Sequence, residues 1–441
     1  MSKNGQATGS GGRSAAGRLM ILCSTTGYQT RAFVETAREM GLPLALGSDR
    51  CHVLDDPWKD EALPLRFEDP EASAQSIVEY ARSNPLQGIV ALGDRPAPAA
   101  ARAAAALGLP FHLPSAADVC RDKYLSRERL RAAGLNIPAF ERFPIDSDPR
   151  EIVRDGGPQP GFPCVLKPLA LSASRGVIRA DNEQEFITSF ERIRALLRSP
   201  EVQVMREEMS GYIQAEAYIE GEEIAVEGVV GQGRMKILAI FDKPDPLEGP
   251  YFEETIYVTP SRLSNAAQRR IEETIERAIA ALGLYHGPFH AELRWNRRGA
   301  WPLEVAARSI GGLCSRMLRL ELPGRTGWVS LEQLLIELAL GRDIEAVRRE
   351  KAAAGVMMIP IEREGVYEGV EGLEAARSVP GVEDIVITVA PKQHLTPLPE
   401  GGCYLGFIFA RSRLPEDVED TLRAAHRQLS FEMTPALPVV Y

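Results

Sequence analysis

The amino-acid sequence predicts a multidomain protein that combines α/β with α+β architecture, and three observations point to this class. From Arg18 onward, short apolar runs alternate with amphipathic stretches, which is typical of a parallel sheet with helical crossovers. Near the middle of the chain, several strand patterns follow one another closely, as in an antiparallel sheet. The last hundred residues alternate again, which indicates a small α+β unit. We therefore expect domains at residues 18–115, 116–341 and 342–441.

The first unit is expected to be a small parallel sheet. Its strand patterns lie at 19–22, 43–46 and 88–92, and its helical patterns lie at 32–40 and around 77–81. Residues 24–27 and 93–94 follow two of these strands, at the sheet edge where ligands gather in open α/β folds. Residues 1–17 are rich in Gly, Ser and Ala and have too little apolar surface to offset their ordering entropy, so we expect a disordered tail.

The two later units are expected to contain more strands. For 116–341 we expect helices at 116–133, 265–282 and 330–340, and strands at 162–168, 213–219, 223–230, 235–241 and 289–295. For 342–441 we expect strands at 356–360, 385–389 and 404–410, and a helix at 418–428.

Composition and charge narrow the class of protein. The formal net charge is −10 and the isoelectric point about 5.4, which argues against nucleic acid as a partner. No run of 18 apolar residues occurs, and no basic segment followed by an apolar stretch begins the chain, so we expect a cytoplasmic protein without membrane contact. The six cysteines contain no CxxC pair, which favours reduced, buried thiols over disulfides or structural zinc.

Two lysines and a loop of small residues are candidates for a polyphosphate site. Lys123 lies near a helix start, and Lys167 lies at the end of a strand pattern. The loop at 171–177 follows, with small residues at Ser172, Ser174 and Gly176. Ammonium groups neutralise phosphate oxygens, and small residues let backbone N–H groups approach them. Alternatively, both lysines are simply solvated, and the loop does not have the GxxxxGK[ST] spacing of a P-loop.

A strand followed by an acidic turn is a candidate adenosine site. The strand ends with Glu216, Ala217, Tyr218 and Ile219, and Glu223 opens the next strand pattern. A strand edge offers backbone N–H and C=O groups to an adenine, and a carboxylate can accept both ribose hydroxyls. An acidic hairpin turn without a ligand is the alternative interpretation.

Glu292 and Glu304 are the candidate metal ligands. Each lies in an apolar strand pattern, and a turn at 296–299 joins the two strands. We therefore expect adjacent antiparallel strands with the two carboxylates at a similar height. Paired like charges repel, and Mg²⁺ is a natural cation between carboxylates because it prefers hard oxygen ligands. The alternative is a solvated sheet face that carries two glutamates.

Arg308, Gly311 and Gly312 follow the second of these strands and are candidate catalytic residues. An arginine at this place can hold an anionic intermediate, and two glycines give backbone N–H groups room to meet an oxyanion. A surface arginine before a flexible turn is the alternative.

Together these residues resemble the ATP-grasp superfamily over about residues 18–341, most clearly from Lys123 to Gly312. The resemblance implies an ATP-grasp fold with a Rossmann-like pre-ATP-grasp domain before it and a small α+β domain after it. It also implies ATP and Mg²⁺ or Mn²⁺ as cofactors. The residues that it assigns are the phosphate lysines Lys123 and Lys167, the adenine hinge Glu216 to Ile219, the ribose carboxylate Glu223, the metal ligands Glu292 and Glu304, and Arg308 at the phosphorylated intermediate.

Within the superfamily, the stretches at 242–246, 249–254, 260–261 and 304–308 look most like the L-amino acid ligase group. Lys243 lies in the first of them, and we count it among the catalytic residues. Two departures are visible: Ala306 stands where many relatives have an asparagine after the second metal glutamate, and the phosphate loop is poor in glycine. Biotin carboxylases follow the matching arginine with Gln-Val-Glu-His, which is absent from this chain, as is the Met-Lys-Met sequence that carries biotin.

The functional hypothesis is an ATP-dependent carboxylate–amine ligase that forms an acyl phosphate, with amino acids or related small molecules as substrates. Glu253 or Glu254 is available to bind the α-ammonium group of the carboxylate substrate. One alternative is a biotin-carboxylase-like enzyme that activates bicarbonate, because the last unit resembles the closing domain of those enzymes. Another is a non-catalytic ATP-binding sensor, because of Ala306 and the glycine-poor loop. A homodimer is the default expectation for the assembly.

Overall fold

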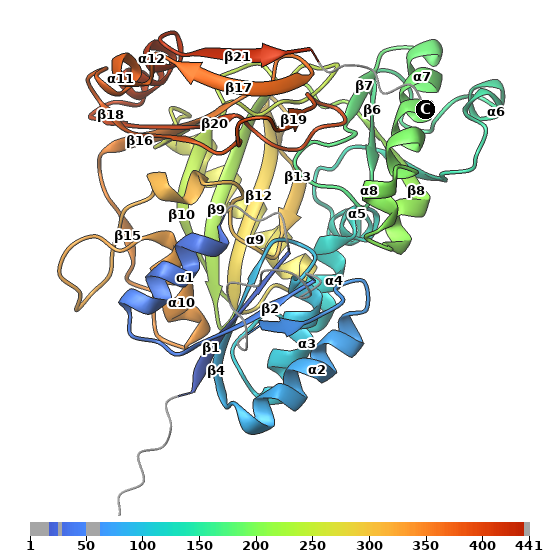
Figure 1. Ribbon diagram of the computed structural model, residues 1–441. Coiled ribbons are helices and arrows are strands. Elements are labelled where there is room, and N and C mark those ends of the chain that lie inside the picture. The colour runs from blue at the N-terminus through green and yellow to red at the C-terminus, as the bar shows by residue number, and fades with distance from the viewer. Residues whose placement is uncertain (1–16, 25–28, 50–61, 436–441) are drawn as a thin grey trace, which may run out of the picture.

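The computed structural model describes residues 17–24, 29–49 and 62–435. Nearly all of the expected N-terminal tail, and most of the expected turn at 24–27, lie outside these residues. Figure 1 follows the described chain from the N-terminal sheet at the bottom, through the segment with α7 at the upper right, to the C-terminal strands at the top. The expected mixture of α/β and α+β parts is confirmed.

The N-terminal part is a parallel sheet with the order β3-β2-β1-β4. Its strands are β1 (Arg18–Cys23), β2 (Leu44–Ser48), β3 (Ala62–Pro64) and β4 (Leu86–Leu92), and its helices are α1 (Thr30–Glu39), α2 (Pro70–Ser83) and α3 (Ala97–Leu107). Leu19 and Ile21 pack in one core with α1, whereas Met20 and Leu22 pack in another with α2 and α3. Side chains alternate along a strand, so a sheet covered on both faces needs the continuous apolar run that the sequence shows.

One expected helix is in fact two. We expected a single helix at 116–133, but the structure has α4 (Pro114–Arg121) and α5 (Lys123–Ala132). Asp122 between them has extended backbone angles, and its carboxylate accepts the N–H groups of Tyr124 and Leu125. Aspartate stabilises a helix start in this way, so it ends one helix and begins the next. As a result, Lys123 occupies the first turn of α5.

The next part is a four-stranded antiparallel sheet with the order β5-β8-β6-β7, covered by helix α7 (Glu183–Leu197). Its strands are β5 (Phe140–Pro144), β6 (Cys164–Pro168), β7 (Ile178–Ala180) and β8 (Tyr212–Ala217). Shorter helices are α6 (Pro149–Arg154), α8 (Pro200–Gln203) and η1 (Glu208–Gly211). Phe186 and Phe190 on α7 fill the core against this sheet.

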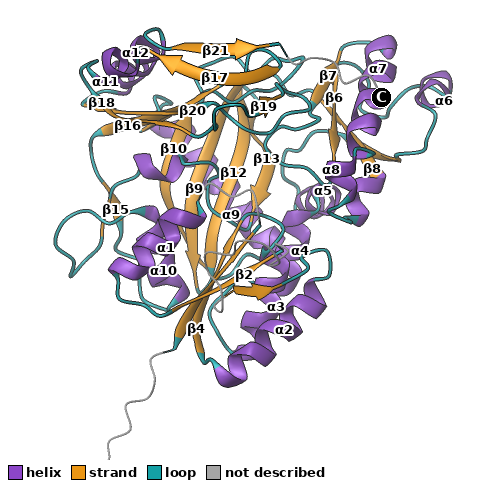
Figure 2. Ribbon diagram, viewed as in Figure 1, coloured by secondary structure: helices purple, strands orange, loops and turns teal. Residues whose placement is uncertain are grey.

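The largest sheet runs through the centre of the molecule in the order β13-β12-β9-β10-β11-β16-β20-β18 (Figure 2). Its strands before residue 341 are β9 (Glu222–Gly231), β10 (Arg234–Asp242), β11 (Ile256–Thr259), β12 (Gly287–Asn296) and β13 (Gly299–Ala306). Its later strands are β16 (Ala353–Ile359), β18 (Val382–Ile387) and β20 (Gly406–Ser412). This sheet crosses the boundary expected after residue 341, and the domain limits remain predictions.

Helices and short strands complete the fold. They are α9 (Asn265–Leu282), η2 (Cys314–Met317), α10 (Leu331–Ala339), α11 (Leu373–Arg377), α12 (Pro415–His426), β14 (Leu320–Glu321), β15 (Arg348–Arg349), β17 (Gly365–Glu371), β19 (His394–Leu395) and β21 (Ser430–Thr434). α9 packs on one face of the central sheet, and α12 packs against β16 and β20.

Two further expectations concern the described residues. Of the helices there, none is both long and apolar enough to cross a lipid bilayer. The five cysteines within the described ranges form no disulfide, and four of them are buried, in agreement with the expected reduced thiols. The sixth, Cys51, lies outside the described residues.

Candidate active site

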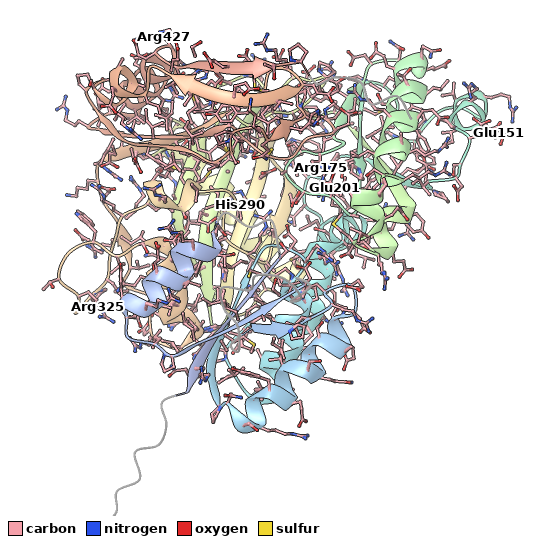
Figure 3. The ribbon with its side chains drawn as sticks, viewed as in Figure 1. Glu151, Arg175, Glu201, His290, Arg325 and Arg427 are labelled. Atoms are coloured by element: carbon pink, nitrogen blue, oxygen red, sulfur yellow. The ribbon has the colours of Figure 1, made fainter. Side chains whose placement is uncertain are left out.

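A cavity of about 1550 Å³ lies where the N-terminal sheet, the β5–β8 sheet and the central sheet meet. In Figure 3, Arg175 and Glu201 lie toward the α7 side of the molecule, and His290 lies on the central sheet; all three line the cavity. Apart from Glu253 and Glu254, the sequence proposes sixteen site residues, and fourteen of them also line the cavity. The two exceptions are Gly176 and Lys243, which are buried but do not line the cavity.

The two predicted phosphate lysines reach this cavity from different elements. Lys167 Nζ, at the end of β6, lies 2.6 Å from Glu216 Oε2, and Lys123 Nζ, at the start of α5, donates to Leu171 O at 2.9 Å. Burial lowers the pKa of Lys167, although Glu216 acts in the opposite direction. The ammonium group of Lys123 therefore lies beside the loop at 171–177, whereas that of Lys167 is held by Glu216; both lysines line the cavity.

The loop at 171–177 is held against the C-terminal part of the chain. Ala173 and Ser174 have positive φ angles, each of 56°, and the N–H of Gly176 donates to Pro399 O at 2.8 Å. Arg175 Nε donates to Glu400 O at 2.9 Å. Because the Gly176 amide already has a partner, the loop offers the cavity Ser172 and Ser174 instead.

Glu216 occupies the centre of a buried ionic group. Its Oε1 lies 2.9 Å from Arg127 Nε, and its Oε2 accepts from Arg127 Nη2 at 3.1 Å and from Lys167. Burial opposes ionisation, but Arg127 and Lys167 together lower the pKa of Glu216 to about 2. Arg127 also donates to Leu303 O, next to Glu304 on β13. The ion pairs of Glu216 thus hold the predicted adenine hinge in place. Tyr218 and Ile219 of that hinge line the cavity.

Sequence reasoning missed Arg127, although a signal was present. Arg127 is 1% exposed and lies four residues after Lys123 on α5. Residues four apart share a helix face, so an arginine on the same face as a predicted phosphate lysine pointed toward this site.

The predicted alignment of the two metal glutamates is confirmed. Glu292 on β12 pairs directly with Glu304 on β13, and both side chains line the cavity. Carboxylates directly opposite each other suit a divalent cation, and ATP phosphates would supply further oxygens. Ala306 has no ligand atom, so these two carboxylates are the donors that β12 and β13 offer from the predicted set.

A second acidic cluster adjoins this pair. Carboxylate oxygens of Glu223, Glu254 and Glu292 lie within 4.8 Å of one another. Lys243 Nζ lies 2.9 Å from Glu223 Oε1 and 3.5 Å from Glu292 Oε1, and it also contacts Glu254. Burial disfavours its charge, but the three carboxylates raise the pKa of Lys243 well above its usual value.

The three carboxyl groups of this cluster outnumber its two cations, Lys243 and Arg294, whose Nε lies 2.9 Å from Glu223 Oε2. Burial raises the pKa of Glu254 to about 7, although Lys243 acts in the opposite direction. The hydroxyl of Tyr257 donates to Glu254 Oε1 at 2.8 Å. Glu253 lies apart from the cavity lining, near Ile361 and Glu362. A further cation, either a metal ion or a substrate ammonium group, would therefore be favoured at Glu254.

Arg308 lies near both Glu304 and Asp94. Its Nε lies 3.0 Å from each carboxylate oxygen of Asp94, and its Nη2 lies 4.0 Å from Glu304 Oε1. Burial opposes its charge, but Asp94 and Glu304 hold the pKa of Arg308 above its usual value. Gly312 has a φ of 61°, and a Cβ atom there would lie 3.1 Å from Phe407, so glycine is the residue that fits.

Known families match three parts of the chain. The ATP-grasp N-terminal domain matches residues 34–111, the ATP-grasp domain matches residues 160–317, and the L-amino acid ligase C-terminal domain 2 matches residues 357–434. These regions lie in the N-terminal sheet, around the cavity and in the C-terminal strands, respectively.

Similar proteins include ligases. The L-amino acid ligase from Bacillus licheniformis superposes with a TM-score of 0.78 and 26% identity, over 95% of this chain and 99% of that one. An uncharacterized protein of Sinorhizobium fredii is 25% identical over 95% of this chain and 84% of its own length. Alanine–anticapsin ligase of Bacillus subtilis is 28% identical over 225 residues, which is 48% of this chain and 46% of that ligase. This last match thus spans about half of each protein.

Proposed function

Since this chain belongs to the ATP-grasp superfamily and its relatives are ligases that form C–N bonds, we propose that it joins two amino acids through an acyl phosphate. The observation that carries this proposal is the cavity wall on β12 and β13. There, Glu292 belongs to the acidic cluster around Lys243, and Glu304, directly opposite Glu292 in the strand pair, lies 4.0 Å from Arg308. Phosphoryl transfer depends mainly on this kind of positioning and charge.

In the first step, a carboxylate oxygen of one amino acid attacks the γ-phosphorus of ATP. The bond from that phosphorus to the β,γ-bridging oxygen breaks, and ADP leaves. Lys123 and Lys167 neutralise phosphate oxygens, and Glu223 accepts the ribose hydroxyls beside the hinge at 216–219. A divalent cation held by Glu292 and Glu304 would supply charge neutralisation at the phosphates.

In the second step, the amine nitrogen of the other substrate attacks the acyl carbon. The acyl C–O bond to the phosphoryl group breaks, phosphate leaves, and the amine proton passes to phosphate or solvent. Arg308 and the N–H groups of Gly311 and Gly312 stabilise the negative charge that develops on the acyl oxygen. Lys243 holds the carboxylates of Glu223, Glu254 and Glu292 in place through its ion pairs.

Glu254 is the better candidate for binding the α-ammonium group of the first substrate. It lines the cavity and belongs to the cluster that has excess negative charge, whereas Glu253 does neither. Tyr257, Cys314 and Met358 line the same wall and are buried, so an apolar side chain beside the ammonium group suits this end of the cavity.

Activation of bicarbonate is supported less well. The C-terminal strands match the L-amino acid ligase C-terminal domain, and the residues after Arg308 are Ser309, Ile310, Gly311 and Gly312. None of these four offers a side chain that could act as a base for bicarbonate at neutral pH.

The test is release of ADP and phosphate from ATP and Mg²⁺ with pairs of amino acids, with bicarbonate in a parallel series. We expect release that requires two amino acids, accompanied by a dipeptide detected by mass spectrometry, and we expect Glu304→Gln to abolish both. Release that depends on bicarbonate alone would replace this proposal with the carboxylase. ATP binding without ADP release under any mixture would replace it with the sensor.

A further inference from the structure

A carboxylate inside the central sheet contacts the loop that carries Arg308. Glu227 lies on β9 in register with His290 on β12, and it is 0% exposed. Its Oε2 lies 3.0 Å from His290 Nδ1 and accepts the N–H of Ile310 at 2.9 Å. Glu227 is therefore tied to the backbone two residues after Arg308.

The same residue, Ile310, is held on its other side. The side-chain amide of Gln29, just before α1, donates to Ile310 O. Glu227 thus fixes the peptide unit between Ser309 and Ile310, and Gln29 fixes the next one, between Ile310 and Gly311. A trans peptide unit is planar, with its C=O and N–H pointing in opposite directions. Holding Ile310 O in place therefore sets the direction of the Gly311 N–H.

Stability alone does not account for a carboxyl group at this place. Burial raises the pKa of Glu227 well above its usual value, which favours its neutral form. Burying a polar group still costs free energy, and an apolar side chain of similar volume would pack in a sheet interior without this penalty. We attribute the benefit of Glu227 to what it holds. Within the described residues, its backbone hydrogen bond is to Ile310, in the segment that lines the cavity beside Glu304.

We propose that Glu227, together with Gln29, is a positioning residue that sets the geometry of residues 308–312 for the chemical steps. This inference rests on the proposed function, because the segment matters only if Arg308 and the N–H of Gly311 meet the reacting acyl group. Three separate elements converge on the segment: β9 through Glu227, the start of α1 through Gln29, and the end of β4 through Asp94.

The experiment compares Glu227→Gln, Glu227→Leu and Gln29→Leu with the wild-type enzyme. We expect kcat to fall by between about 10-fold and 100-fold, the effect of misplacing a catalytic group by about 1 Å, while KM for ATP changes by less than about threefold. Glu227→Gln retains a carbonyl acceptor for the Ile310 N–H, so it is expected to lose less than Glu227→Leu. Gln29→Leu acts from outside the sheet and provides the test if a Glu227 variant does not fold.

The matched control is Glu337→Gln. Glu337 is also buried, at 1% exposed, but it lies on α10 and pairs with Arg325 and Arg342, away from the cavity. It is expected to lower the free energy of unfolding without lowering kcat. Amide hydrogen exchange of the peptide that spans residues 305–312 is expected to speed up in the Glu227 and Gln29 variants and to stay unchanged in the control.

The outcomes separate the two proposals. Suppose that the wild-type enzyme is active and that the Glu227 and Gln29 variants fold. If the kcat of these variants lies within threefold of the wild-type kcat, this inference is overturned and the proposed function is left intact. A fall in kcat of the same size in Glu337→Gln would also overturn it, because a general loss of stability would then explain the effect. A wild-type protein that releases no ADP with any pair would overturn the proposed function, and this inference with it.

Discussion

Arg308 and Asp94 connect two parts of the chain that lie 214 residues apart, with Arg308 Nε at 3.0 Å from both carboxylate oxygens of Asp94. Asp94 follows β4, so it lies at the carboxyl edge of the N-terminal parallel sheet, where open α/β sheets place their ligands. Arg308 follows β13 in the central sheet. The contact means that the N-terminal part of the chain orients an arginine for which we propose a catalytic role.

Replacing Asp94 by asparagine is expected to lower kcat without a matching effect on ATP binding. The amide keeps the shape of the side chain but removes the charge that holds the guanidinium group in place. A small misplacement of a catalytic group costs on the order of 10-fold to 100-fold in rate. Steady-state kinetics with the substrate pair found in the ADP assay would measure kcat and KM for ATP separately.

The control for Asp94 is a similar ion pair in the same part of the chain. Asp118 accepts two hydrogen bonds from Arg102, each of 2.9 Å, and it does not line the cavity. Asp118→Asn is expected to leave kcat unchanged. An equal decrease of kcat in Asp94→Asn and Asp118→Asn would contradict a specific role for the contact between Asp94 and Arg308.

Glu254→Gln is expected to raise KM for the amino acid that supplies the carboxylate. A hydrogen bond to a charged group contributes about 1.5–3 kcal/mol, which corresponds to a rise of roughly 10-fold to 150-fold. Glu253→Gln, one residue away and outside the cavity lining, is the matched control and is expected to leave this KM unchanged. Substrate titrations of both variants, with the amine substrate saturating, would show the difference. A larger effect in Glu253→Gln would mean that the wrong glutamate has been chosen.

Much of the fold could be predicted because the relevant signals are local. The apolar run at 19–22 is continuous because both faces of β1 are covered. The pairing of Glu292 with Glu304 could be predicted because the turn between their strands is short, which leaves little freedom in the register. These two features need no knowledge of distant parts of the chain.

Other features depend on contacts that sequence patterns do not reveal. Helical periodicity continues across Asp122, and only the capping role of this aspartate separates α4 from α5. Glu254 lies in a loop, so its membership in the cluster with Glu223 and Glu292 follows from the packing of three segments. Asp94 was noted as a residue at a strand end, but its partner Arg308 comes from another sheet.

Glu400 is expected to support ATP binding by holding the loop at 171–177, which we propose binds the phosphates. Its carboxylate pairs with Arg192 on α7, and its carbonyl accepts from Arg175 in the loop at 171–177. The ion pair is partly exposed, and such pairs contribute at most about 1 kcal/mol, so Glu400→Gln is expected to raise KM for ATP by no more than about fivefold. Titration of ATP against the variant would measure this. A change in kcat with KM unaltered would contradict a role in nucleotide binding.

The buried group around Glu216 predicts how stability depends on pH. Arg127 and Lys167 lower the pKa of Glu216 to about 2 in the folded protein, from an ordinary value of 4.5. A carboxyl group whose pKa is lower in the folded state stabilises the protein above the unfolded pKa and loses that contribution as pH falls. The difference between 4.5 and about 2 corresponds to an upper limit of roughly 3 to 4 kcal/mol.

This contribution to stability is therefore expected to be lost between about pH 4.5 and pH 2, because in this range the unfolded chain binds a proton at Glu216 and the folded protein does not. Urea unfolding at a series of pH values would measure the free energy of unfolding for the wild type and for Glu216→Gln. The variant is expected to be less stable near neutral pH, because Arg127 and Lys167 then lack their carboxylate. Its free energy of unfolding should also fall less steeply in the acid range, because the missing carboxyl group no longer takes up a proton on unfolding. Parallel curves for the two proteins between pH 4.5 and pH 2 would show that Glu216 is not the group that titrates there.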